Sequence, residues 1–351
     1  MKIYIMTHMK CELPTADGYV PLQVGRAIGQ DLGYTGDHTG DNISDLNPLF
    51  GELTGLYWIW KNDRDSDIIG INHYRRFFAE EDGELLRQST VEETLKKYDL
   101  IAPVQMVGED SHYETYKKVH NSKDMDAVRA AIKTCYPQYL ETFDAVMNTK
   151  EGYYGNLCVM KREIYMSYCE WLFTILFEAS KQIDVSGYDA YHKRVYGFLS
   201  EPMLKVFTVY NDLKVKEMPV IYTSEKAETK ELKAAIGQLL RMGQIEEADQ
   251  LYHEFVALRP DVRLPASDIR RELPMIEMIL YIIKMEKEYG VEGMYTDTHE
   301  LSELIDNVRF IKELIIIKSR GEEIDEAHTK RLEKLHVSEI TKQVIIQNLD
   351  Y

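Results

Sequence analysis

Strand-like and helix-like segments alternate through the first 222 residues, and this order restricts the fold more than any other feature of the chain. The short apolar runs typical of strands are 2–7, 67–72, 98–103 and 153–161. The segments with the apolar spacing of helices are 42–62, 124–132, 141–147 and 163–181. Such alternation is typical of a sheet covered by helices. We therefore predict an α/β fold for this part of the chain.

The chain changes character near Thr223, because all three tryptophans precede it and helical periodicity dominates after it. We expect two domains, 1–222 and an all-α C-terminal extension, 223–351. The stretch 231–260 resembles one tetratricopeptide helix pair, and Leu301 begins an apolar seam with alternating spacings of three and four. The extension is either a partner-binding or self-association module or a helical cap.

The charge balance limits the classes of partner. Lys and Arg together number 42 and Asp and Glu 59, which gives a formal net charge of −17 at pH 7. A broadly basic nucleic-acid-binding surface and a polybasic membrane anchor are therefore not expected. A local cationic site remains compatible with this balance. No run approaches the roughly 20 apolar residues of a membrane span.

Cysteine use and the N-terminal residues favour a reducing compartment. The four cysteines are scattered, without C-x-x-C pairs or zinc-ligand spacing, so neither a disulfide framework nor a metal-binding cysteine cluster is expected. The apolar stretch at residues 3–6 is too short for a signal peptide. We expect a cytoplasmic protein, either free or peripheral at the inner face of the cell membrane.

The segment His73-Tyr74-Arg75-Arg76 is the strongest candidate for a binding site. It follows the run 67–72, and open α/β sheets bind ligands at the carboxyl ends of their strands. Two guanidinium groups beside an imidazole suit a phosphate or diphosphate. The alternative is that the arginines pair with structural carboxylates and that His73 is a core residue.

Three other segments carry polar side chains at loops or helix ends. Asn42 and Ser44 lie where a helix is predicted to begin, with Ser44 as its N-cap, and free N–H groups there can hold a ribose or phosphate. Asn156 follows a glycine turn and can donate to and accept from sugar hydroxyls. Asp189 and Glu201 are candidate general bases, and Arg194 can hold either of them or a leaving phosphate.

Several common catalytic motifs are missing. The chain has no G-x-x-x-x-G-K-[ST], no G-x-G-x-x-G after the first strand, no G-x-S-x-G and no H-E-x-x-H. Their absence disfavours the usual ATPase, dehydrogenase, hydrolase and metalloprotease sites.

Taken together, five motifs resemble the bacterial capsular and exopolysaccharide glycosyltransferase-like family, which was first catalogued as a domain of unknown function. They are N-I-S-x-x-N-P at 42–48, E-L-T-G-L-Y-W-I-W-K-N at 52–62, I-G-I-N-H-Y-R-R-F-F at 69–78, Y-C-E-W-L-F at 168–173 and R-V-Y-G-F-L-S-E at 194–201. The resemblance covers about residues 1–222. It implies a GT-A-type nucleotide-sugar transferase with a Rossmann-like mixed sheet flanked by helices.

The resemblance also suggests roles for individual residues. It places the donor near the end of the first strand, at Thr7 and His8, with Asn42, Ser44, Asn156 and Arg194 around the nucleotide or sugar. GT-A enzymes usually carry D-x-D after a central strand, to hold a divalent ion on the donor diphosphate. Here His73, Arg75 and Arg76 stand there instead, as the expected diphosphate-binding residues, and we expect the two arginines to neutralise the diphosphate without a metal. The alternative is Mn²⁺ or Mg²⁺.

This chain departs from the family pattern at two places. It reads Asn156-Leu157-Cys158 where the family commonly has N-M-F, and Glu201-Pro202-Met203-Leu204 where the family commonly has E-R-L-L. The second departure removes an arginine that would follow Glu201, so the charge pairing around this carboxylate need not match the family.

The expected activity is transfer of a hexose from a nucleotide-diphosphate sugar, with a UDP-sugar as the expected donor. The acceptor would be a glycan or lipid-linked glycan in surface polysaccharide synthesis. Two alternatives stay open. One is a non-catalytic scaffold for glycan assembly, and the other is a phosphate-ester hydrolase or phosphotransferase that uses His73.

Overall fold

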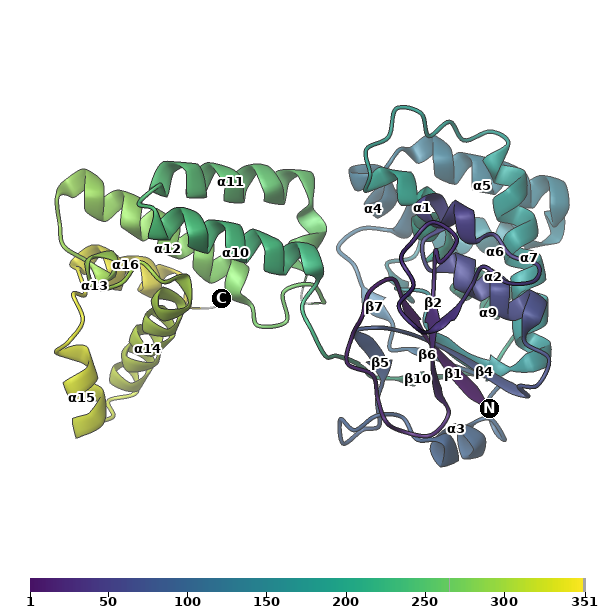
Figure 1. Ribbon diagram of the computed structural model, residues 1–351, viewed down its shortest axis with the longest axis horizontal. Coiled ribbons are helices and arrows are strands. Elements are labelled where there is room, and N and C mark those ends of the chain that lie inside the picture. Colours follow the sequence, from purple (N-terminus) through teal and green to yellow (C-terminus); the bar gives the residue numbers. More distant parts are fainter. Residues whose placement is uncertain (265, 350–351) are drawn as a thin grey trace. The chain divides into compact units, whose positions relative to one another are not determined.

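The computed structural model describes residues 1–264 and 266–349. The chain forms two compact units, Met1–Thr223 and Ser224–Tyr351, and each is described by itself (Figure 1).

The first unit is built on a nine-stranded sheet. Along its main path the strand order is β10-β6-β9-β4-β1-β2-β3, and β5 and β11 extend it beside β4. The strands are β1 (Lys2–Thr7), β2 (Tyr19–Gln23), β3 (Thr35–Gly36), β4 (Ile68–His73), β5 (Arg76–Phe78), β6 (Leu100–Pro103), β9 (Cys158–Lys161), β10 (Val215–Met218) and β11 (Val220–Tyr222). The pairs β1–β2, β1–β4, β2–β3 and β6–β10 are parallel, whereas β9 runs antiparallel to both of its neighbours. A separate ribbon pairs β7 (Met106–Val107) with β8 (Glu151–Gly152).

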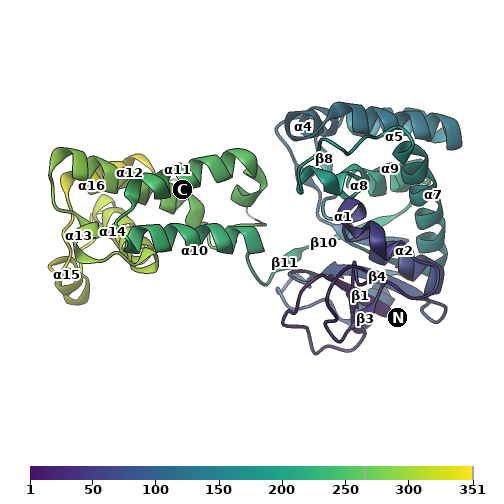
Figure 2. The ribbon, with the colours of Figure 1, turned by 45° about the horizontal axis from the view of Figure 1, so that its top comes forward.

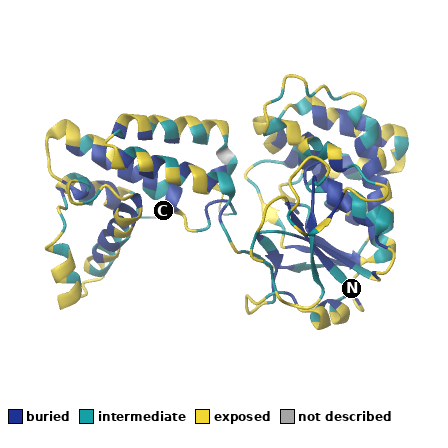
Figure 3. Ribbon diagram, in the orientation of Figure 1, coloured by how far each residue is buried: buried dark blue, intermediate teal, exposed yellow. Residues whose placement is uncertain are grey.

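Helices cover both faces of this sheet (Figures 1 and 2). They are η1 (Ser44–Leu46), α1 (Asn47–Phe50), α2 (Leu53–Asn62), α3 (Gln88–Thr94), α4 (His112–Val119), α5 (Ser122–Cys135), η2 (Pro137–Tyr139), α6 (Leu140–Met147), α7 (Arg162–Ser180), η3 (His192–Arg194), α8 (Val195–Ser200) and α9 (Met203–Tyr210). Side chains of α2 and α5–α9 share one large core with Ile69 and Ile71 of β4. A smaller core around Phe78 and Val91 lies on the other face, under α3. Burial is concentrated in the strands and the inward sides of the helices (Figure 3).

Four predicted strands are present, but the fourth is shorter than expected. The prediction 153–161 retains only Cys158–Lys161. Gly155 and Asn156 have φ values of +87° and +54°, which are incompatible with a strand, so the preceding residues form a turn. The sequence patterns also missed β2, whose burial does not alternate clearly.

The predicted helix 42–62 is wrong as a single element. Gly51 interrupts it at φ +55° and ψ −132°, outside the helical region. The chain instead forms η1, α1 and α2 in sequence. Ser44 is not an N-cap either, since Ile43 precedes η1 and the Ser44 hydroxyl bonds elsewhere.

The second unit consists of helices, as predicted. They are α10 (Ala227–Arg241), α11 (Ile245–Leu258), η4 (Pro260–Arg263), α12 (Glu272–Tyr289), α13 (Met294–Asp297), α14 (Leu301–Ser319), α15 (Glu326–Leu332) and α16 (Glu339–Gln347). Helices α10 and α11 are joined at Gly243, whose φ is +73°, and form the helix pair expected near 231–260. Leu301, Leu304, Val308 and Ile311 of the predicted seam are buried in a core shared with α12.

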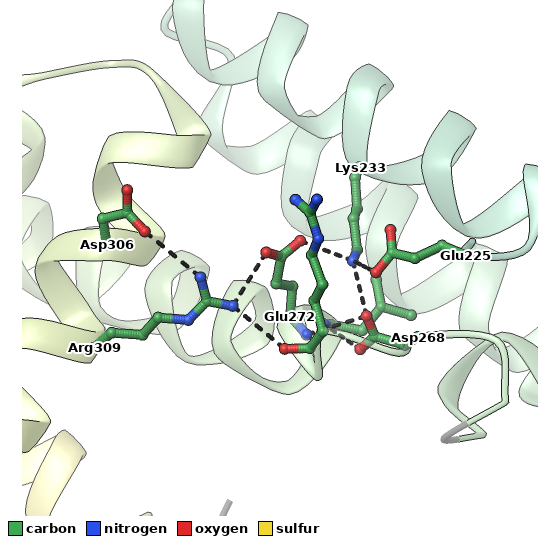
Figure 4. A network of polar contacts seen from close by, with 8 residues as sticks. Glu225, Lys233, Asp268, Glu272, Asp306 and Arg309 are labelled. Carbon is green, nitrogen blue, oxygen red and sulfur yellow. Dashed lines mark hydrogen bonds and ion pairs between the residues drawn. The ribbon is translucent and has the colours of Figure 1, made fainter. Parts of the chain in front are cut away.

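A buried lysine connects the start of this unit to its helices. Lys233 Nζ lies 2.7 Å from Glu225, 2.8 Å from Asp268 and 2.9 Å from Glu272, and Glu272 also accepts from Arg309 (Figure 4). The lysine side chain is only 11% exposed. Pairing of this kind avoids an isolated buried charge, so the network stabilises the packing of α10 against α12.

Candidate functional site

The carboxyl ends of β1, β2 and β4 meet at one edge of the sheet. Met6 of β1 is in register with His73 of β4, and Thr7 is in register with Gln23 of β2. Because side chains alternate along a strand, His73 shares the face of Ile69 and Ile71, where α2 and α8 pack. The sheet therefore delivers His73 toward the helical layer.

A tight turn places Arg76 beside His73. The two residues are register partners across β4 and β5, and directly opposed side chains project to the same face. Arg75 lies in the turn and is buried, with its carbonyl accepting from Thr223 N–H at 3.1 Å. The Arg76 guanidinium lies against Gly155, since a Cβ built there would be 2.6 Å from Nη1. Two of the three predicted diphosphate-binding side chains, His73 and Arg76, therefore face one point.

Glu52 joins this cluster from the start of α2. Its Oε1 accepts a hydrogen bond from Asn156 Nδ2 at 2.8 Å, and its Oε2 lies 3.4 Å from Arg194 Nη2. Asn156 Oδ1 in turn accepts from Ser200 Oγ at 3.0 Å. Asn156, Arg194 and His73, predicted site residues from three separate segments, thus meet at Glu52, which the sequence analysis did not single out.

Glu201 is the second carboxylate of the cluster. Burial raises its pKa to about 7, and the negative charge of Glu52 adds to the rise. Arg76, Arg194 and the Gly155 N–H oppose the rise, which shows that these groups surround the same carboxyl. Near neutral pH, Glu201 is therefore divided between its protonated and ionised forms.

The pKa values of Glu52 and His73 are lowered, whereas the pKa of Glu201 is raised. Burial alone would raise the pKa of Glu52, but His73, Arg194 and Asn156 together hold it below its ordinary value. Burial lowers the pKa of His73, and the three arginines lower it further against the pull of Glu52. His73 is thus neutral at pH 7, and its Nε2 is buried without a hydrogen-bond partner among the described residues.

The residues predicted to bind the nucleotide divide into three groups. Asn156 and Arg194 belong to the cluster. Thr7 ends β1 and His8 follows it, with the His8 ring packed edge-on against Tyr74 at a centroid distance of 5.2 Å. His8 also lines a cavity of about 590 Å³ at the ends of β1 and β2, which is lined by His8, Met9, Lys10, Gln23, Val24, Gly25, Ile28, Gly29, Gln30, Leu32 and Asn47.

Asn42 and Ser44 are occupied in holding the 25–44 loop. Asn42 Nδ2 donates to the carbonyls of His38 and Gly40. The buried Ser44 hydroxyl donates to Asp37 and accepts from Ala27 N–H. Both side chains have these protein partners in the structure, and their role toward a nucleotide stays a prediction.

The structure distinguishes the two predicted bases. Asp189 is 62% exposed and accepts from the N–H groups of Tyr191 and His192, with His192 Nδ1 2.7 Å away. These hydrogen bonds lower its pKa. Asp189 therefore stabilises its own turn, whereas Glu201 faces the arginines.

Sequence reasoning missed two acidic residues, Glu52 and Asp37. The buried Asp37 accepts from the N–H groups of Gly25 and Arg26 at 2.9 and 3.0 Å and organises the loop after β2. Glu52 begins the E-L-T-G-L-Y-W-I-W-K-N motif, and that position was the available signal.

The described residues of this edge do not form a preassembled metal site of their own. No group of three or more His, Cys, Asp or Glu side chains suited to a metal ion occurs in residues 1–264 and 266–349. The two carboxylates of the cluster are surrounded by arginines, and Glu52 already accepts from Asn156 and Arg194. A divalent ion here would need further ligands, such as the phosphate oxygens of a bound nucleotide, so metal dependence stays a prediction. In the same described residues, no helix is long and apolar enough to cross a membrane.

Comparison with known proteins bears on the family and the fold of the chain. The chain is similar to a solved structure described as the apo form of WbbM, a bifunctional glycosyltransferase, with 30% identity and a TM-score of 0.60. The match covers 64% of this chain and 45% of that chain, so less than half of that protein is represented. No curated protein was found to match.

This similarity confirms the predicted fold class, an α/β unit with a glycosyltransferase-like, mostly parallel sheet flanked by helices, followed by a helical region. The family model described as a domain of unknown function, DUF4422, matches residues 2–212. Since this match spans more than half of the chain, the chain belongs to the DUF4422 family.

Proposed function

We propose that the first unit transfers a sugar from a nucleotide-diphosphate donor to a hydroxyl of a glycan or lipid-linked glycan. The observation that carries the proposal is the meeting of Arg76, Arg194 and Glu201 at the carboxyl edge of β4. Cations at such an edge suit a diphosphate, and a carboxyl with a pKa of about 7 suits proton transfer at neutral pH. The similarity to a bifunctional glycosyltransferase supports the same reaction class.

In the proposed reaction, the acceptor oxygen attacks the anomeric carbon of the donor sugar. The bond between that carbon and the diphosphate oxygen breaks, and the electron pair leaves with the nucleoside diphosphate. Fixed guanidinium groups stabilise the negative charge that develops on this leaving group. Ionised Glu201 takes the proton of the acceptor hydroxyl. This direct displacement inverts the configuration at the anomeric carbon.

Neutral His73 has a different role from the arginines in this proposal. Its buried Nε2 can form a hydrogen bond with an oxygen atom of the nucleotide sugar, but an uncharged ring does not neutralise the diphosphate. The charge is left to the guanidinium groups. We therefore propose that a divalent metal is dispensable, and that a UDP-sugar is the first donor to examine.

Binding of a panel of UDP-, GDP- and dTDP-sugars, followed by donor turnover, tests the proposal. A bound nucleotide sugar raises the apparent stability of the first unit, because it binds only the folded state. Replacing both arginines, Arg75→Ala with Arg76→Ala, should abolish this stabilisation and the transfer. Unchanged donor affinity in that folded double variant would refute the diphosphate assignment. Binding by the wild type without any turnover would favour the scaffold alternative.

Surface polysaccharide synthesis at the inner face of the membrane is the proposed setting, because the sequence motifs resemble a family with that role. The C-terminal helical unit is proposed to bind a partner or a second copy of the chain. Light scattering can compare the oligomeric state of the full chain with that of residues 1–223 and so test binding of a second copy. The same oligomeric state in both would contradict self-association through the C-terminal unit.

A further inference from the structure

Glu52 has contacts that a helix-starting residue does not require. Its carbonyl accepts from Gly55 N–H at 3.0 Å and so begins α2, as any residue type would allow. Its side chain instead turns toward the sheet edge, after a backbone reversal at Gly51. A Cβ at Gly51 would come within 3.3 Å of Arg194 Nη2, so glycine gives the guanidinium room to approach.

The carboxylate joins segments that are far apart in the chain. Asn156 is 104 residues away and Arg194 is 142 residues away, yet each contacts one of its two oxygens. The side chain is 14% exposed, whereas Arg194 is 45% exposed. The less exposed Glu52 therefore holds the long, more exposed Arg194 side chain in place at the rim of the proposed donor site.

We propose that Glu52 is a positioning residue for the transfer: through hydrogen bonds it holds Asn156 and Arg194 at the site where Glu201 accepts the proton of the acceptor. The proposal rests on the proposed glycosyl transfer. Glu52 itself touches no reacting atom in it.

The charged groups around both carboxylates determine the direction of the effect. Glu201 faces Glu52, Arg76, Arg194 and the Gly155 N–H, and the Tyr154 hydroxyl is close enough to sense its charge. Glu52 faces His73, Arg194 and Asn156. Among these neighbours of Glu201, Glu52 carries the negative charge that opposes its ionisation.

Removing the charge of Glu52 should therefore make Glu201 ionise more readily. In Glu52→Gln the repulsion disappears, and Arg194 loses its partner and becomes available to Glu201. Both changes favour the ionised form. A single nearby charge moves a pKa by about one unit or more, so the pH at half-maximal kcat/KM should fall by about one unit.

The experiment compares pH profiles of kcat/KM for the wild type, Glu52→Gln and Arg194→Gln, with Glu170→Gln as control. Glu170 is exposed on α7 and lies outside the cluster. We expect a lower midpoint in Glu52→Gln, a higher midpoint in Arg194→Gln and no change in the control. Arg194 is sufficiently exposed that its replacement should leave the fold intact even if Glu52→Gln does not fold.

A second measurement follows the ionisation of Glu201 without relying on transfer activity. The pH dependence of thermal stability, with and without Glu201→Gln, reports the ionisation of Glu201 directly. An unmoved ionisation of Glu201 in folded Glu52→Gln would overturn the inference. Loss of transfer at every pH in that variant would also overturn it, since Glu52 would then be a catalytic residue. An inactive wild type with the predicted stability shifts would contradict the transfer reaction but support the electrostatic coupling.

Discussion

Replacing Glu201 by glutamine should stabilise the protein in a pH-dependent way. The folded unit holds the Glu201 proton up to a pKa of about 7, compared with an ordinary value of 4.5. Between these pH values the folded state binds more protons than the unfolded state, so the wild type loses stability as the pH rises. Glutamine keeps a neutral, similarly shaped side chain and escapes this loss.

The size of the effect follows from the two pKa values. At pH 5 the carboxyl destabilises the wild type by about 1 kcal/mol, and at pH 8 by about 3 kcal/mol. The stability advantage of Glu201→Gln should therefore grow by roughly 2–3 kcal/mol over this range. For a unit of this size, that corresponds to a difference in Tm of roughly 5–10 °C.

Differential scanning calorimetry at pH 5 and pH 8 can measure this difference. The chain has two compact units, and only the transition of the first should move, so the second serves as an internal reference. Glu170→Gln should show no change in its difference from wild type between the two pH values. An equal shift at both pH values, or a less stable Glu201→Gln at pH 8, would refute the claim that the fold raises the pKa of Glu201 to about 7. The stabilised variant should also have lost transfer activity.

Three further perturbations test separate parts of the structure. Gly155→Ala and Gly83→Ala each place alanine at an unfavourable positive φ, at a cost of about 1 kcal/mol, but only Gly155→Ala also displaces Arg76. Donor-binding assays should therefore show lost affinity in Gly155→Ala alone. Equal donor affinities of the two variants would contradict the placement of Arg76. Lys233→Met removes the cation shared by Glu225, Asp268 and Glu272, of which Glu272 keeps its ion pair with Arg309. This variant should destabilise the second unit by about 3–5 kcal/mol in denaturant unfolding, whereas the exposed Lys230→Met should have little effect. Similar stabilities of the two variants would show that the network of Figure 4 contributes little. Removal of divalent ions with EDTA should leave transfer unchanged, and activity restored only by Mn²⁺ or Mg²⁺ would refute the metal-free assignment.

Four of the strands and the cationic turn could be predicted because their signals are local. The apolar run before His73 identifies β4, and the arginines follow it within three residues. Hairpin geometry then places Arg76 opposite His73 without further information. The break at Gly51 was not predictable from apolar spacing, because the leucines on either side keep a helical period while the backbone reverses between them.

The carboxylates show why the rest of the site could not be predicted. Asp189 and Glu201 both lie in the segment around Arg194, and both had the residue type that a base requires. They differ in burial: the exposed Asp189 is stabilised as an anion by two N–H groups of its own turn, whereas Glu201 is placed beside Glu52. Glu52 comes from a position 149 residues earlier, so the repulsion between the two exists only once α2 and α8 have packed on the same face of the sheet. The chemical identity of a side chain is local, but the pH at which it reacts is a property of the fold. For the same reason, a net charge of −17 gives no indication of a cluster in which Arg76 and Arg194 face two carboxylates.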